Sequence, residues 1–137
     1  MSLRLYGEYT RKDAGMLNPL QLAYIGDVVW EIMIRDAMIH RGLNVRHMHT
    51  ESVGYVNARS QAAFLRQIQD ELTEEEAEIA RRGRNAHARH PAPRNQDPED
   101  YSASTGFEAL IGYLYLTGQE TRLTGITEKI IKGERHG

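Results

Sequence analysis

The chain has 137 residues, a formal net charge of −2 at pH 7 and no cysteine. This length allows one domain with a real core, and the lack of cysteine excludes a disulfide framework and a thiolate metal site. The near-neutral charge excludes a uniformly basic nucleic-acid binder, so any RNA-binding charge must be local. No apolar run reaches the length of a membrane span and the N-terminus lacks a signal-peptide core, which predicts a cytoplasmic protein.

The first strong helical pattern follows a lead-in with no clear period. Residues 1–16 are predicted to be irregular. A long, central helix is then predicted over Leu17 to Arg41, because apolar residues nearly surround it. Asn18 is its expected N-cap, Pro19 its first helical residue and Gly42 its C-terminal cap.

This helix carries one aspartate within an apolar run. An unpaired carboxylate on an apolar helix costs several kcal/mol, so Asp27 needs a compensating group. Backbone donors that satisfy a buried acceptor are one possibility. A helix terminus, a basic partner or a metal ion are the others. By helical spacing Asp27 shares a face with four other residues, which are Leu20, Tyr24, Val28 and Glu31.

The middle of the chain predicts three further helices. Residues 43–72 have the spacing of two helices with a break near residues 57–60. Residues Thr73 to Glu76 form a capping box that opens another helix, with acids in its first turn. We interpret the four acids between Glu74 and Glu78 as a solvated helix start rather than a metal site.

An arginine-rich segment follows, from Arg81 to Arg94, with five arginines and no acid. Its glycine and prolines make a regular helix unfavourable beyond about Ala88. A solvated, flexible loop is one interpretation. Phosphate binding is the other, because arginine suits bidentate phosphate contact. We expect weak order without RNA and ordering on binding, with RNA-binding candidates at Arg82, Arg84, Asn85, His87, Arg89 and Arg94.

A second apolar helix repeats the design of the first. Residues 95–103 are predicted to be a polar connector, and a Ser/Thr cluster at 102–105 is predicted to start the helix one turn before Glu108. The helix should end at Thr117–Gly118. A short amphipathic helix should then close the chain, marked by Leu123, Ile126, Ile130 and Ile131.

Two such helices, packed together, would bring Asp27 and Glu108 into one site. Glycines flank both carboxylates and would allow the two backbones to approach closely. Two converging buried carboxylates, far apart in sequence, indicate a hard divalent cation such as Mg²⁺. The whole pattern predicts an all-α fold of about six or seven helices, with a single domain over residues 17–137.

Both segments resemble one known family. Residues 24–31, Tyr-Ile-Gly-Asp-Val-Val-Trp-Glu, resemble the signature helix of the ribonuclease III family, and residues 107–116 resemble its second catalytic helix. The likeness covers most of residues 17–132, and the chain stops where the family's double-stranded-RNA-binding domain would normally begin. A catalytic domain alone is similar to the bacterial mini-ribonuclease III branch. Acids of the common family pattern would fall at Ala23 and Thr105, so only Asp27 and Glu108 carry over as catalytic and metal-binding carboxylates.

The resemblance implies a catalytic-domain fold and a Mg²⁺-dependent endoribonuclease, with Mn²⁺ able to substitute. Its implied substrate is double-stranded RNA, in particular a 23S ribosomal RNA precursor, cut to give 5′ phosphates and short 3′ overhangs. The resemblance also implies a homodimer in which Tyr24 enters a pocket of the partner subunit. Recognition of duplex RNA should depend on A-form shape and backbone rather than on base sequence.

Two other functions remain open from the sequence. The reduced acidic set is compatible with a non-catalytic RNA-binding or ribosome-assembly module on the same fold. An all-α metal-dependent phosphohydrolase acting on nucleotides would need His-Asp metal pairs, and this chain has no His-Asp dipeptide. A magnesium-dependent cleavage assay on duplex RNA separates the nuclease from the non-catalytic module.

Overall fold

The computed structural model describes residues 3–86 and 92–136, the last three by backbone only, and within them the regular elements are all helical. This confirms the predicted all-α class and helix number. None of the described helices combines the length and apolar character needed to cross a bilayer. The elements are α1 (Arg11–Gly15), α2 (Pro19–His40), α3 (Val45–Val56), α4 (Ala58–Ile68), the 3-10 turn η1 (Gln69–Glu71), α5 (Glu74–Asn85), α6 (Pro98–Leu116) and α7 (Glu120–His136).

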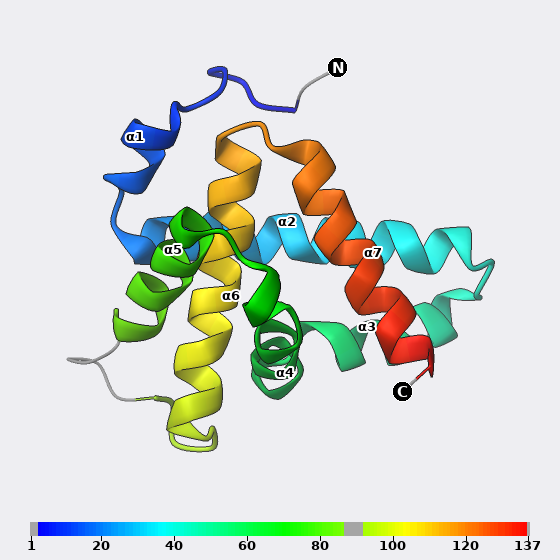
Figure 1. The fold of residues 1–137 in the computed structure, drawn as a ribbon. Coiled ribbons are helices and arrows are strands. Elements are labelled where there is room, and N and C mark those ends of the chain that lie inside the picture. Colours follow the sequence, from blue (N-terminus) through cyan, green and yellow to red (C-terminus); the bar gives the residue numbers. More distant parts are fainter. Residues whose placement is uncertain (1–2, 87–91, 137) are drawn as a thin grey trace.

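Helix α6 is the centre of the fold. It runs between α2, α4 and α5, which pack on different sides of it (Figure 1). From Ala103 to Leu114 every residue except Glu108 is buried. A helix that is apolar nearly all round needs partners on all sides, and α6 has them. Glu108 is the one charged side chain in this enclosed stretch.

The start of α6 differs from the prediction. The helix begins at Pro98, and Asp97 caps it by accepting hydrogen bonds from the backbone N–H groups of Glu99 and Asp100. The hydroxyls of Ser104 and Thr105 instead donate to the carbonyl of Tyr101 within the helix. The Ser/Thr cluster is therefore internal, because a preceding Asp-Pro pair provides both a cap and a preset φ. Glu108 lies about three turns into the helix rather than one.

The predicted boundaries of α2 are confirmed to within two residues. Asn18 and Gln21 form a capping box, and Pro19 is the first helical residue. Gly42 follows the C-cap with φ +71°, the left-handed conformation that glycine adopts at low cost. The break between α3 and α4 also falls where predicted, since the Asn57 side chain accepts from the backbone N–H of Ser60.

The chain ends are more ordered than the sequence predicted. Residues 1–16 include α1, and Ala14 is fully buried. Arg4 donates to the carbonyl of Tyr115, and the N–H of Tyr9 donates to the carbonyl of Leu116. The lead-in therefore packs on the C-terminal end of α6 through backbone groups that no periodicity reveals. Helix α7 has 17 residues and is longer than the short helix predicted.

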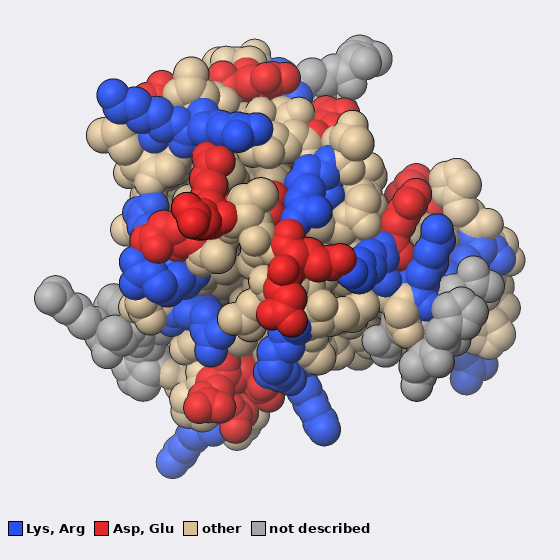
Figure 2. Space-filling model, viewed as in Figure 1, with Lys and Arg blue, Asp and Glu red and all other residues tan. Residues whose placement is uncertain are grey.

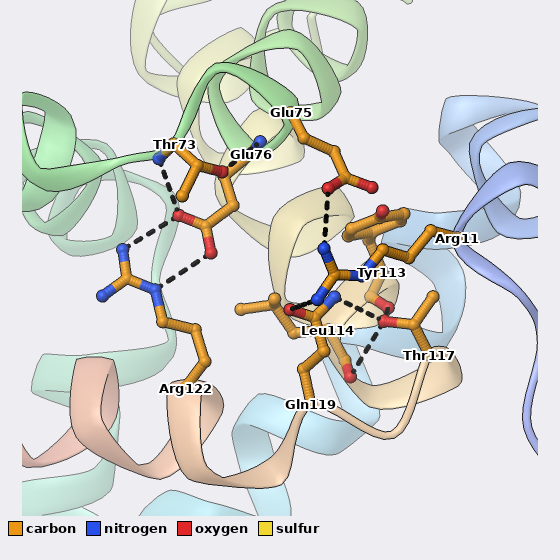
Figure 3. A network of polar contacts seen from close by, with 9 residues as sticks. All are labelled: Arg11, Thr73, Glu75, Glu76, Tyr113, Leu114, Thr117, Gln119 and Arg122. Carbon is orange, nitrogen blue, oxygen red and sulfur yellow. Dashed lines mark hydrogen bonds and ion pairs between the residues drawn. The ribbon is translucent and has the colours of Figure 1, made fainter.

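A polar network joins α5 to α7 (Figure 3). The Thr73–Glu76 capping box that opens α5 forms as predicted. However, Glu76 is buried, and Arg122 donates from Nε and Nη2 to its two carboxylate oxygens at 2.9 Å. The interpretation of the acids as fully solvated is thus wrong for Glu76, which binds α7 to the start of α5.

Candidate catalytic site

Two glycines decide how closely α2 and α6 approach. A Cβ at Gly26 would lie 1.8 Å from the carbonyl oxygen of Glu108, and one at Gly112 would lie 1.9 Å from the carbonyl oxygen of Leu22. The two helices therefore cross backbone against backbone. This is the close approach expected from the flanking glycines, and it places Asp27 and Glu108 at the crossing.

An aromatic cluster holds the same crossing from the core side. Trp30 of α2 packs edge to face on Phe107 of α6, with ring centroids 4.9 Å apart, and also contacts Phe64 of α4. The indole N–H of Trp30 donates to the carbonyl of Tyr55 at 2.8 Å. Because Phe107 and Trp30 are fully buried, their packing restricts the rotation of both carboxylate-bearing helices.

The structure brings Asp27 and Glu108 into direct contact. Burial raises the pKa of the Glu108 carboxyl, and a hydrogen bond to Asp27 and the charge of Asp27 act in the same direction, so that this pKa is about 8. Asp27 itself is exposed, while Glu108 is half-buried. The expectation of two buried carboxylates is therefore wrong for Asp27. The pair opens to solvent on the Asp27 side and is enclosed on the Glu108 side.

This donor set fits a divalent cation. Two carboxyl groups in contact repel when both are ionised, so they either share a proton or bind a cation between them. Their oxygens are the ligands that Mg²⁺ and Mn²⁺ prefer. Among the side chains described in residues 3–86 and 92–133, no group of three or more His, Cys, Asp or Glu could hold a metal ion. Any ion held here would therefore take most of its ligands from water or phosphate.

The two positions at which the family resemblance implies acids contribute no charge. Ala23 is buried on α2, and Thr105 is buried on α6 with its hydroxyl donating to the carbonyl of Tyr101. Neither side chain offers a carboxylate. The site thus consists of one carboxylate from each helix.

The arginine-rich segment is only partly the loop that was expected. Arg82, Arg84 and Asn85 lie in the last turn of α5. His87 and Arg89 lie outside the described residues. Arg94 is exposed, in the turn before α6. A Cβ on Gly106 would lie 2.8 Å from Cγ of Arg84, so the Arg84 stem crosses α6 two residues before Glu108.

Arg82 has internal partners that the prediction of phosphate contact did not include. Its guanidinium donates to the carbonyls of Gly15 and Leu17, which precede α2. Arg84 and Asn85 are exposed at the end of α5. On the face shown in Figure 2, basic and acidic side chains are interspersed, so no surface of one sign covers that face. On this face, positive charge for a polyanion must therefore come from a small set of residues.

Tyr24 is 82% exposed on α2, and Val28 and Ile32 on the same side of the helix are 60% and 54% exposed. These residues form an apolar stripe without cover in the single chain. Further along α2 a groove of about 320 Å³ lies between α2 and α3. Its apolar lining is Met38, Ile39, Val45, Met48, Val53 and Val56.

Sequence reasoning missed the role of Gly83. The local pattern indicates a helix breaker, but Gly83 is buried within α5, where a Cβ would lie 2.8 Å from Cα of Gly106. The signal available was the pair of glycines, one on each helix, since small residues permit close helix contact. The Glu76–Arg122 pair left no sequence signal, because its partners are 46 residues apart.

The chain is similar to known proteins in both sequence and fold. The model of the Ribonuclease III domain matches residues 20–119. The chain is 48% identical to Mini-ribonuclease 3 of Symbiobacterium thermophilum over 82% of this chain and 86% of that relative. It is 40% identical to Mini-ribonuclease 3 of Clostridium tetani over 95% and 93%. A crystal structure of a protein from Fusobacterium nucleatum superposes with a TM-score of 0.79 at 32% identity, covering 87% and 95%.

Proposed function

This chain belongs to the ribonuclease III family and is an endoribonuclease, and we propose that it cleaves double-stranded RNA at the Asp27–Glu108 site. The observation that supports this assignment is the contact between one exposed and one half-buried carboxyl group at a backbone-to-backbone helix crossing. The exposed side admits a phosphodiester. The enclosed side keeps Glu108 in place.

The residues divide the chemistry between them. Asp27 and Glu108 would hold Mg²⁺, or Mn²⁺ in its place, directly or through its waters. A bound divalent ion supplies Lewis-acid polarisation and neutralises charge that develops on phosphate oxygens. Glu108 must lose its proton to act as a ligand, and its raised pKa means that a cation and a proton compete for it. No nucleophilic side chain is required, so water is the proposed nucleophile. A 5′ phosphate is the product that the family resemblance implies.

We assign RNA binding to the end of α5 and the segment after it. Arg84 and Asn85 are exposed there, and the Arg84 stem packs against α6 at Gly106. His87, Arg89 and Arg94 follow in the sequence. Arginine contacts to phosphate carry no base information, so affinity should be similar for duplexes of different sequence. A precursor of 23S ribosomal RNA is the substrate we propose, from the resemblance to mini-ribonuclease III.

The assembly we propose is a homodimer with two-fold symmetry. An RNA duplex has two strands, and a symmetric pair of sites cuts both. The exposed stripe of Tyr24, Val28 and Ile32 continues along α2 into the apolar groove beside α3. We propose that a second copy covers this surface, with Tyr24 buried against the partner subunit. Sedimentation should show a dimer at micromolar concentration and a monomer for Tyr24→Lys, whereas Tyr6→Lys in the exposed lead-in should remain dimeric. A monomeric parent would refute the assembly.

Cleavage of a long RNA duplex with and without Mg²⁺ tests the function. The parent should cut the duplex and spare a DNA duplex of the same sequence. Asp27→Asn and Glu108→Gln should each abolish cleavage while RNA binding persists, because shape is kept and only the charge of the ligand is removed. Glu31→Gln is the matched control, since Glu31 lies one turn beyond Asp27 and pairs with Arg35. Retained cleavage in Asp27→Asn or Glu108→Gln would remove that residue from the site.

A further inference from the structure

Arg82 connects two parts of the chain that lie far apart in sequence. It projects from the last turn of α5, and its side chain is half-buried. Nη1 donates to the carbonyl of Gly15, and Nη2 donates to the carbonyl of Leu17 at 3.2 Å. Gly15 ends α1 and Leu17 directly precedes Asn18, the N-cap of α2. One guanidinium group therefore holds the turn from which α2 starts.

The same turn of α5 is attached to α6. A Cβ at Gly83 would lie 2.8 Å from Cα of Gly106 and 3.1 Å from the carbonyl oxygen of Thr105. At Gly106, a Cβ would lie 2.6 Å from the carbonyl oxygen of Ala80. Such close backbone contact prevents α5 from sliding along α6. Arg82 thus links the start of α2 to a helix that is fixed on the Glu108-bearing helix.

Helix α2 has a second attachment to α6, at the Gly26–Gly112 crossing. This crossing and the Trp30–Phe107 packing limit tilt and roll of α2 from within the helix, and neither contact holds its start. The Arg82 contacts lie about nine residues before Gly26, roughly 13 Å along the helix axis, so they oppose both motions. Asp27 meets Glu108 at one particular tilt and roll of α2. We propose that Arg82 is a positioning residue, which holds the start of α2 so that the Asp27 carboxyl meets that of Glu108.

The proposal assigns Arg82 a role that a simple positive charge cannot perform. A planar guanidinium reaches two carbonyl oxygens at once, whereas a lysine ammonium is a point charge on a flexible stem. Lysine still attracts phosphate. Arg82→Lys therefore separates positioning from phosphate contact, because it keeps the charge and removes the planar fork.

The test compares Arg82→Lys and Arg82→Ala with Arg84→Lys and Arg84→Ala, at a temperature where all four are folded. Single-turnover cleavage of an RNA duplex is measured at saturating enzyme, and affinity for the same duplex is measured without metal. Hydrogen exchange is followed at the amides that begin α2, Leu20 to Leu22. Both Arg82 variants should cleave about tenfold more slowly or worse, bind RNA within about twofold of the parent, and exchange faster at these amides. The Arg84 pair should show the opposite pattern, with weaker binding by Arg84→Ala, nearly normal binding by Arg84→Lys, and unchanged exchange.

Parent-like cleavage and binding in Arg82→Lys, with weakened binding in Arg82→Ala, would show that Arg82 binds phosphate and overturn the proposal. Parent-like behaviour of both Arg82 variants would also overturn it. The cleavage measurement rests on the function proposed above, and the exchange measurement does not. If the parent fails to cut RNA, the proposed function fails, and unchanged exchange in both Arg82 variants would still refute the link between Arg82 and α2.

Discussion

The backbone of Glu108 occupies the place that a side chain on Gly26 would take, with the Glu108 carbonyl oxygen 1.8 Å from that Cβ position. This contact lies one residue before Asp27. The approach of the two helices and the meeting of the two carboxyl groups are therefore the same structural feature.

Gly26→Ala should consequently damage both stability and activity. The methyl group would contact backbone, which cannot move aside as a side chain can, so we expect the free energy of unfolding to fall by about 3 kcal/mol or more. Chemical denaturation followed by circular dichroism measures this change. Gly125→Ala is the matched control, because Gly125 lies on α7 with no described atom within 4 Å of its Cβ position. That change should stabilise the protein by about 0.5–1 kcal/mol. Equal effects of the two substitutions would contradict the close crossing.

Stability should depend on pH through Glu108. Its pKa is about 8 in the folded protein, against an ordinary value of 4.5 in the unfolded chain. The folded state therefore holds a proton that the unfolded chain has released between these values, and the free energy of unfolding should fall as pH rises from about 4.5 to about 8. Thermal melting across this range, without divalent cations, measures the slope.

Glu108→Gln should flatten that slope and melt at a higher temperature than the parent at pH 8. The reason is that glutamine keeps the shape of the protonated acid and cannot repel Asp27. Added Mg²⁺ should raise the melting temperature of the parent at pH 8 and leave that of Glu108→Gln nearly unchanged. If the pH dependence of stability persists in Glu108→Gln, a titrating group other than Glu108 causes it.

The Glu76–Arg122 pair should stabilise the fold in a different pH range. Burial alone would raise the pKa of Glu76, but hydrogen bonds from Arg122 and the Thr73 backbone, with the charge of Arg122, lower it below 4.5 overall. Its stabilising effect is present above pH 4.5 and disappears as pH falls through the lowered value. Glu76→Gln should cost about 1–3 kcal/mol at pH 7. Glu78→Gln is the control, because it breaks only an exposed pair with Arg81 and should hardly change the free energy of unfolding. Urea denaturation at pH 7 measures both variants.

Removal of arginines from the arginine-rich segment should change the salt dependence of RNA binding. The triple change of Arg84, Arg89 and Arg94 to Ala should weaken binding to every duplex by a similar factor. The slope of log affinity against log salt should become shallower by about 1 for each phosphate group that the variant no longer neutralises. A control with Arg46, Arg66 and Lys132 changed to Ala has the same change in net charge at exposed sites on α3, α4 and α7. If both triple variants have the same slope of log affinity against log salt, the RNA does not bind at the arginine-rich segment.

Local signals in the sequence were enough to locate most of the helices and to select the two carboxylates of the candidate site. Asn18 and Asn57 cap helices through hydrogen bonds to residues two or three positions ahead. Such contacts are local, so the starts of α2 and α4 could be predicted from the sequence. Asp27 and Glu108 were identifiable because a carboxylate in an apolar helix needs a compensating group. The flanking glycines predicted the close approach of the two helices, because glycine has no side chain to hold the backbones apart.

The groups that meet across long stretches of chain depended on tertiary packing. It placed Asp27 at the surface, although its helix is apolar, because one side of α2 packs on α6 and the other faces outward. It joined Arg82 to the carbonyls of Gly15 and Leu17. The guanidinium group that the sequence suggested for phosphate binding therefore has partners inside the protein. A side chain's partner depends on helix packing, and packing is a property of the whole core rather than of any local pattern.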